Sequence, residues 1–140
     1  MFKYLRTLNN SSHPTEVVTY IGYEGDANNN TINAGTIVSI VFDEVSTDYT
    51  QSLPMYLALT SKPKHIAKEI KLIRILSGMV LEADIEPDTD ISNYPLGSIC
   101  DALPDNTGKG TYVTNQGIGK FEVIDNSEVE KKGKVTVVVI

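Results

Sequence analysis

The sequence predicts a mainly β fold, arranged as a single-domain β-sandwich or barrel of about eight short strands. Short runs rich in Val, Ile, Thr and Tyr recur along the chain. Apolar and polar residues alternate within these runs, which is the period of a half-buried strand. Clusters of Gly, Asn, Asp and Pro separate the runs, as expected for turns. Strands and turns at this spacing are typical of sandwiches and barrels.

The expected strands follow one another in chain order. The clearest alternation is in residues 79–86, where Met79 and Leu81 lie on one face and Glu82 and Asp84 on the other. Turn residues are expected at 25–30, 33–35, 105–110, 115–119 and 131–133. The runs themselves cover residues 2–8, 17–23, 35–42, 55–60, 69–76, 79–86, 110–113, 120–124 and 134–140.

Residues 64–76 fit two patterns. Ile66, Ile70 and Ile73 recur at helical spacing, whereas Ile70, Leu72 and Arg74 also alternate as in a buried strand. We interpret 69–76 and 79–86 as a hairpin that turns at Ser77-Gly78. The interpretation leaves room for one short helix near residues 62–70.

A chain of 140 residues predicts one domain. A domain of this size buries about two-thirds of its unfolded surface, enough for a core without metals or disulfides. We expect residues 1–30 to form an N-terminal arm or edge strands packed on a β-rich domain of residues 31–140. Cys100 has no second cysteine to pair with, and its position in an apolar run, between Ile99 and Asp101, predicts a small buried residue.

Several classes of protein are excluded by composition. The sequence has no apolar run near the roughly 20 residues that span a bilayer, and no classical secretory pattern opens it. An isoelectric point near 4.8 argues against a uniformly basic nucleic-acid binder.

The charges are arranged in blocks. Residues 1–6 carry a net +2, residues 7–61 −6, residues 62–74 +4, residues 75–108 −7 and residues 109–140 +1. One basic stretch therefore lies between two acidic ones. It can pair with the acidic stretches of its own fold, where each exposed pair contributes little, or it can face an acidic partner.

The acidic series in residues 82–90 has three possible explanations. It could ligate Ca²⁺, supply a carboxylate pair for glycoside hydrolysis, or keep a strand face solvated. The EF-hand pattern fails, and the chain has no Trp for a sugar platform, so we favour the solvated strand face. His13, His65 and Cys100 are too far apart in sequence to indicate a zinc site. We therefore expect no enzymatic activity, and no catalytic, cofactor-binding or metal site.

Seven short segments follow in order after residue 31. They are "NAGTIVSI", "YLALTSKPKHI", "IKLIRILSGMVLEADI", "SNYPLGSICDAL", "GKGTYV", "GIGKFEVID" and "KKGKVTVVVI". An Ala-Gly-x-hydrophobic strand, an x-Leu-Gly segment, a Phe-x-Val-Ile strand and a Lys-x-x-Val strand occur in this order. In this respect residues 31–140 resemble the small β-rich decoration, or auxiliary capsid, proteins of tailed bacteriophages.

The resemblance implies a structural role in the virion and no catalysis. Such a protein is assembled in the host cytoplasm, binds the outer surface of the capsid, often at points of local threefold symmetry, and stabilises the shell against the pressure of the packaged DNA. The implied partners are the major capsid protein or other virion proteins, and further copies of the chain, with a trimer as one form. Neither direct nucleic-acid binding nor membrane binding is implied.

The resemblance also suggests where partners bind. In such families the N-terminal segment often reaches onto the capsid or a neighbouring subunit, although here it could be simply another strand. The basic block is the other candidate surface. The expected partner-binding residues are Phe2, Tyr4, Arg6, Lys62, Lys64, His65, Lys68, Lys71 and Arg74. Alternatives are a head-fibre, connector or tail component, or a β module that binds sugar or Ca²⁺.

Overall fold

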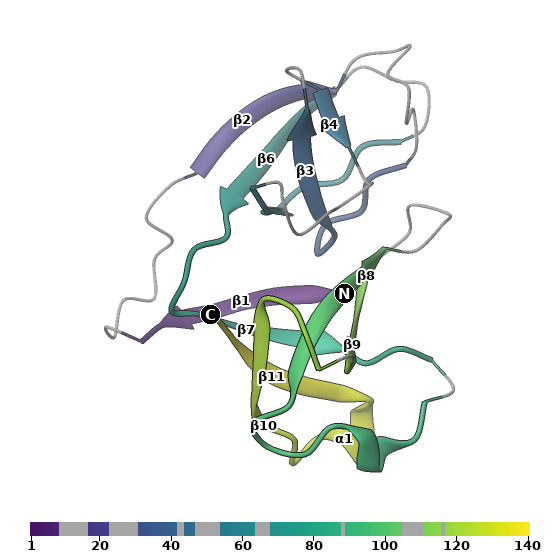
Figure 1. The fold of residues 1–140 in the computed structure, drawn as a ribbon. Helices are drawn as coiled ribbons and strands as arrows, with labels where there is room; N and C mark the ends of the chain where they lie inside the picture. Colours follow the sequence, from purple (N-terminus) through teal and green to yellow (C-terminus); the bar gives the residue numbers. More distant parts are fainter. Residues whose placement is uncertain are drawn as a thin grey trace. The chain divides into compact units, whose positions relative to one another are not determined.

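The computed structural model describes residues 1–8, 17–22, 31–41, 44–46, 54–63, 68–87, 89–104, 111–115 and 117–140. In these residues the fold is mainly β, as predicted, with strands in two sheets that are not closed into barrels (Figure 1). Eleven strands are present there, against the expected eight or so. Two of them, β4 (Glu44–Ser46) and β8 (Ile99–Pro104), lie where no strand is predicted.

The chain forms two compact units, each containing one sheet. The first unit combines Met1–His13, Leu76–Leu103 and Tyr112–Ile140, and the second combines Pro14–Ile75 and Pro104–Thr111. The first 30 residues contribute to both units. They supply β1 (Phe2–Thr7) to the first sheet and β2 (Val17–Gly22) to the second, and each strand lies at the edge of its sheet.

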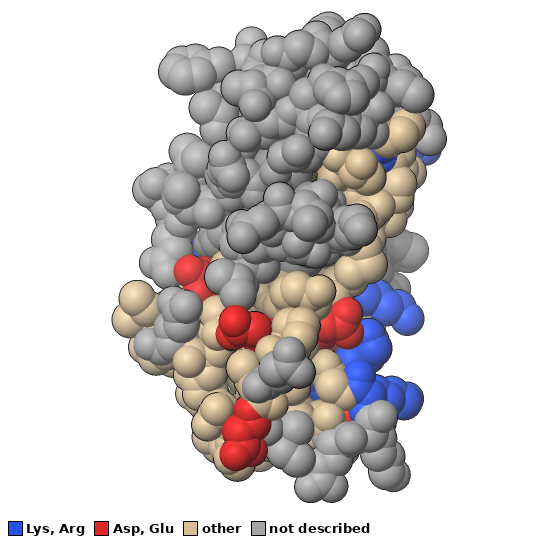
Figure 2. Space-filling model, turned by 90° about the vertical axis from the view of Figure 1, so that its right-hand side faces the viewer, with Lys and Arg blue, Asp and Glu red and all other residues tan. Residues whose placement is uncertain are grey.

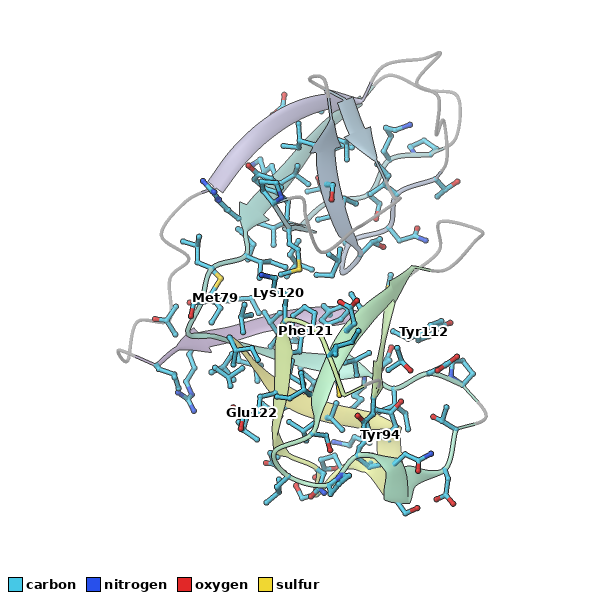
Figure 3. All side chains as sticks on the ribbon, viewed as in Figure 1. Met79, Tyr94, Tyr112, Lys120, Phe121 and Glu122 are labelled. Carbon is cyan, nitrogen blue, oxygen red and sulfur yellow. The ribbon has the colours of Figure 1, made fainter. Side chains whose placement is uncertain are left out.

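The sheet of the first unit has six strands in the order β1-β7-β11-β10-β8-β9. Its remaining strands are β7 (Met79–Asp84), β9 (Thr111–Asn115), β10 (Phe121–Asp125) and β11 (Lys134–Val139). One face of the sheet forms the core of the unit, where the rings of Phe2 and Phe121 lie 5.4 Å apart. Phe121 and Glu122 leave β10 toward opposite faces, since Phe121 is buried and Glu122 is half-buried (Figure 3).

The β9 edge of this sheet meets the residues that follow β7. Val113 forms a single parallel bridge with Ile85, and its carbonyl accepts hydrogen bonds from the Glu86 N–H at 3.1 Å and the Tyr94 hydroxyl at 3.2 Å. Tyr94 is buried, so its hydroxyl needs this partner. The β9 edge of the sheet therefore approaches the end of β7, and the two are joined by a single β-bridge instead of a continuous pair of strands.

The sheet of the second unit has five strands in the order β2-β6-β5-β3-β4. It includes β3 (Ile37–Val41), β5 (Tyr56–Ala58) and β6 (Lys68–Arg74). A turn leads into β3 as predicted: the Thr36 N–H donates to the Asn33 carbonyl, and Gly35 has the positive φ of 92° that the third position of a type II turn requires. The core cluster of this unit contains Ile32, Val38, Val45, Ala58, Ile70 and Leu72.

The predicted hairpin of residues 69–76 and 79–86 is wrong, although both strands exist. β6 pairs with β2 and β5, whereas β7 pairs with β1 and β11. The turn between them is present, because the Met79 N–H donates to the Leu76 carbonyl and Gly78 has φ 88°. Positive φ at this third position is typical of a type II turn, which splays strands apart, whereas two-residue hairpins favour types I′ and II′.

The short helix envisaged near residues 62–70 is not found in the described part of that range. Lys62 forms an antiparallel bridge with Ile32, and β6 begins at Lys68, while residues 64–67 lie outside the described residues. The alternation of Ile70 and Leu72 therefore prevails over the helical spacing. The short helices described are η1 (Ile91–Asn93) and α1 (Val129–Lys132), far from this range.

Gly119 marks a close approach between two backbone segments. Because β8 lies between β9 and β10 in the sheet, the connection from β9 to β10 must cross β8. A Cβ on Gly119 would lie 2.6 Å from the carbonyl carbon of Cys100 and closer still to its oxygen, and its φ of 139° is also unfavourable for other residues.

Gly119→Ala is therefore expected to lower the free energy of unfolding by about 3 kcal/mol or more, through overpacking and backbone strain together. Gly117→Ala is the matched control, since Gly117 also has positive φ but open space around it. It should cost only about 1–2 kcal/mol. Urea unfolding followed by circular dichroism measures both, and equal losses would contradict the crossing geometry.

An ion-pair group holds three strands of the first unit together at one end. The Asp84 carboxylate on β7 accepts a hydrogen bond from Lys134 Nζ on β11 at 2.6 Å and a second one from the Met1 ammonium beside β1. Partial burial raises the pKa of Asp84, but the two hydrogen bonds and the two positive charges outweigh burial and lower the pKa below its ordinary value of 3.8.

Asp84→Asn is expected to lower the free energy of unfolding by about 1 kcal/mol at pH 7, because the groups are partly exposed. A lowered pKa in the folded state means that the contribution is present above about pH 4 and is lost on further acidification. Denaturant unfolding at pH 7 and pH 3 should show the difference between variant and parent shrinking at pH 3. Glu128→Gln, which removes the carboxylate of an exposed pair with Lys132, should change little at either pH.

Candidate functional site

The predicted N-terminal contact residues lie on β1, but they do not share a surface. Phe2 is buried in the core, Tyr4 is half-buried and Arg6 is exposed. Phe2 and Tyr4 face the core side with Leu81 and Ala83, their partners on β7. Of these three residues, Arg6 alone presents a fully exposed side chain.

The predicted basic block also does not form one surface in the described residues. Lys62 is only 2% exposed, and its Nζ donates to the Pro63 carbonyl at 3.3 Å, so it cannot offer its charge to a partner as it stands. Lys64 and His65 lie outside the described residues, and for Lys68 only the backbone, at the start of β6, is described.

Among the side chains of the block that the structure describes, those of Lys71 and Arg74 are exposed. They lie three residues apart on β6, so strand alternation places them on opposite faces. Lys71 is opposite Thr19 of β2, and Arg74 is opposite Tyr56 of β5. Each is accessible to a partner, but the two do not form a single patch on one face.

A second group of charged side chains gathers on the outer face of the first unit. A β-bulge between Tyr4 and Arg6 shifts the register of β1, so that Lys3 is opposite Glu82 and Arg6 is opposite Val80. Glu82 and Val80 share the outer face of β7, and the bulge therefore places both cations of β1 on that face. Without it, Lys3 and Arg6 would point to opposite sides.

We call this surface the charged face. It is formed by β1, β7, β11 and β10, and its members are exposed or half-buried. In Figure 2, Lys and Arg side chains lie close together on part of the described surface, with Asp and Glu side chains nearby. The charged face consists of Lys3, Arg6, Glu82, Asp84, Glu122, Lys134 and Thr136.

The acidic series of residues 82–90 is dispersed among different partners. Asp84 binds Lys134 and the Met1 ammonium, and Glu86 accepts a hydrogen bond from Thr114 at 2.9 Å. Asp90 accepts one from the Ser92 N–H, and Asp88 lies outside the described residues. Within the part of the chain that the structure describes, no three His, Cys, Asp or Glu side chains are placed to hold a metal ion.

Cys100 is fully buried, as predicted from the apolar run in which it lies. Burial raises the pKa of its thiol to about 11. Because the thiolate is the reactive form, this environment gives an inert thiol rather than a nucleophile. His13 and His65, the other residues considered for a zinc site, lie outside the described residues.

The comparisons with known proteins give no relative. The sequence matches no protein-family model, and no curated protein and no solved structure is significantly similar to it. Of the helices described, none is long and apolar enough to cross a bilayer.

Cys100 offers a direct check of the core of the first unit. With DTNB at pH 8, the native protein should release almost no thionitrobenzoate over minutes, because the thiol is both buried and protonated. The same protein in 6 M guanidinium chloride (about the concentration that unfolds most domains) should react at once with one equivalent. Rapid reaction of the native protein would contradict the placement of Cys100.

Proposed function

We propose that this chain is a structural protein of a bacteriophage virion that binds the capsid surface and stabilises the shell. The observation that carries the proposal is the ordered series of segments resembling phage decoration proteins. In the structure each described part of the series has a defined place in the β framework. The Ala-Gly segment forms the turn before β3, the Phe-x-Val-Ile segment is β10, and the final segment contains β11.

The x-Leu-Gly segment also fits this framework. The Ser98 N–H donates to the Pro95 carbonyl, and Gly97, with φ 85°, occupies the third position of that turn. The Gly97 N–H in turn donates to Val123 on β10. Gly35 and Gly97 of the resembling segments thus occupy turn positions that favour glycine, which supports the resemblance.

The second unit carries exposed cations that suit an acidic surface of the shell. Lys71 and Arg74 are exposed, and the strand that carries them is hydrogen-bonded on both sides, by β2 and β5. Because β6 is paired on both sides, the backbone that carries these two cations has a fixed position, and so does the site at which a partner would bind them. Such pairs steer association and fix orientation more than they add affinity.

Immunogold electron microscopy of purified virions, with antibodies against this chain, tests the proposal. The gold should lie regularly over the capsid and not over the tail. Label confined to tails or connectors would support another virion component, and unlabelled particles would rule out a virion protein.

The contribution of the cations can be measured with the purified chain and capsids that lack it. Lys71→Glu combined with Arg74→Glu should weaken capsid binding about tenfold at low salt, and the difference should shrink as salt rises. Lys132→Glu, a reversal at another exposed position, is the control. Binding that responds to neither the double reversal nor salt would remove these residues from the interface.

A further inference from the structure

A row of four side chains runs across the four strands of the charged face, and its two ends are members of that face. Arg6 on β1 is opposite Val80 on β7, Val80 is opposite Val138 on β11, and Val138 is opposite Glu122 on β10. The row therefore reads cation, apolar, apolar, anion. Val80 is 1% and Val138 7% exposed, so the centre of the row is already shielded from water.

The two charged ends of this row cannot reach each other within one chain. They are separated by three strand spacings, or about 14 Å. The ion pairs of the described residues are Met1–Asp84, Lys134–Asp84 and Lys132–Glu128. Arg6 and Glu122 thus have no ionic partner among those residues, although both lie on the outer face.

Other members of the charged face lie directly opposite one another on β7 and β11. Asp84 lies opposite Lys134, and Glu82 lies opposite Thr136. Anions of β7 thus stand beside a cation and a hydroxyl of β11. Charge therefore alternates across the strands of this face, with cations on β1 and β11 and anions on β7 and β10.

We propose that a second copy of the chain docks on the charged face, with a twofold axis that lies in the interface, parallel to the strands and between β7 and β11. This rotation places β1 of one copy over β10 of the other, and β7 over β11. Arg6 then faces Glu122 of the second copy, twice by symmetry, and Asp84 faces Lys134. An interface of this kind is isologous, because the same patch is used on both copies.

The geometry of packed sheets permits these pairs. Two sheets that pack face to face lie about 10 Å apart, a gap that extended Arg and Glu side chains can bridge from opposite sides. The buried Val80 and Val138, which lie between the two pairs, lower the local dielectric beside them, and a lower dielectric strengthens a charge pair compared with one in open water. Leu8 and Ile140 are 58% and 49% exposed beside this face, at the end where Gly78 bonds to both Leu8 and Val139, and they add apolar area.

Sedimentation equilibrium of the full chain tests the dimer. The 15.3-kDa chain should sediment as a dimer at low salt and dissociate progressively as salt rises. Arg6→Glu alone creates a Glu–Glu contact, and Glu122→Arg alone an Arg–Arg contact. Each variant should show a dissociation constant at least tenfold higher than that of the parent.

Mixing the two single variants provides the decisive result. In a heterodimer the Glu at position 6 faces the Arg at position 122, and the remaining Arg6 faces the remaining Glu122, so dimers should reappear. A chain carrying both reversals should also dimerise. Lys132→Glu, outside the face, should leave the parent dissociation constant unchanged, and circular dichroism checks that every variant is folded.

The inference is overturned if the parent is monomeric at high concentration, if it forms trimers only, or if either single variant dimerises normally. It is also overturned if the mixture stays monomeric while both variants are folded. Should a single variant fail to fold, the chain with both reversals still decides the matter, since a folded monomer of that chain contradicts the pairing. Because no capsid is involved, failure here leaves the proposed function untouched.

Discussion

β7 pairs with β1 on one side and with β11 on the other, and its alternation decides which face of the first unit is buried. Met79, Leu81 and Ala83 point to the core, while Glu82 and Asp84 point outward. Because residues that are opposite each other in a sheet point to the same face, the register of β1 and β11 against β7 also decides which of their side chains are buried. A slip of one residue would reverse every side chain, exposing the apolar set and burying two carboxylates, so the register is strongly specified.

The sequence reveals strands better than their pairing. Period-two runs locate nine of the eleven strands that the structure describes, because alternation is a local property. The sequence does not predict β8, although its side chains also alternate: Cys100 and Ala102 are buried, and Ile99 and Asp101 are half-buried. The apolar run is short and flanked by prolines, so the alternation is not evident in the sequence. β4, with three residues, is too short to show a period. The hairpin prediction failed because Ser77-Gly78 indicates a turn without indicating whether the flanking strands pair.

The site was harder to predict than the fold, because residue type does not reveal the direction of a side chain. Phe2 and Lys62 looked suited to a partner, yet both are buried. Lys3 and Arg6 share a face only because β1 contains a bulge. No local pattern in the sequence predicts this bulge. Glu122 was not singled out, since its importance depends on a row across four strands that only the pairing reveals.

Charge blocks along the chain do not become charge patches on the surface. Antiparallel pairing brings Lys3 of the first block and Lys134 of the last beside Glu82 and Asp84 of the most acidic block. Part of the acidic charge is thereby balanced within the sheet, by cations that lie outside the basic stretch of residues 62–74. What remains is a polarity across the strands of the first unit and separate cations on the second.

The two surfaces are carried by different sheets, and this has a physical consequence. Contacts of Arg6 and Glu122 depend on the register of the six-stranded sheet, whereas Lys71 and Arg74 depend on the pairing of β6 with β2 and β5. Side chains that share no partner usually contribute independently to binding and stability. Substitutions at Arg6 and Glu122 are therefore expected to act independently of substitutions at Lys71 and Arg74.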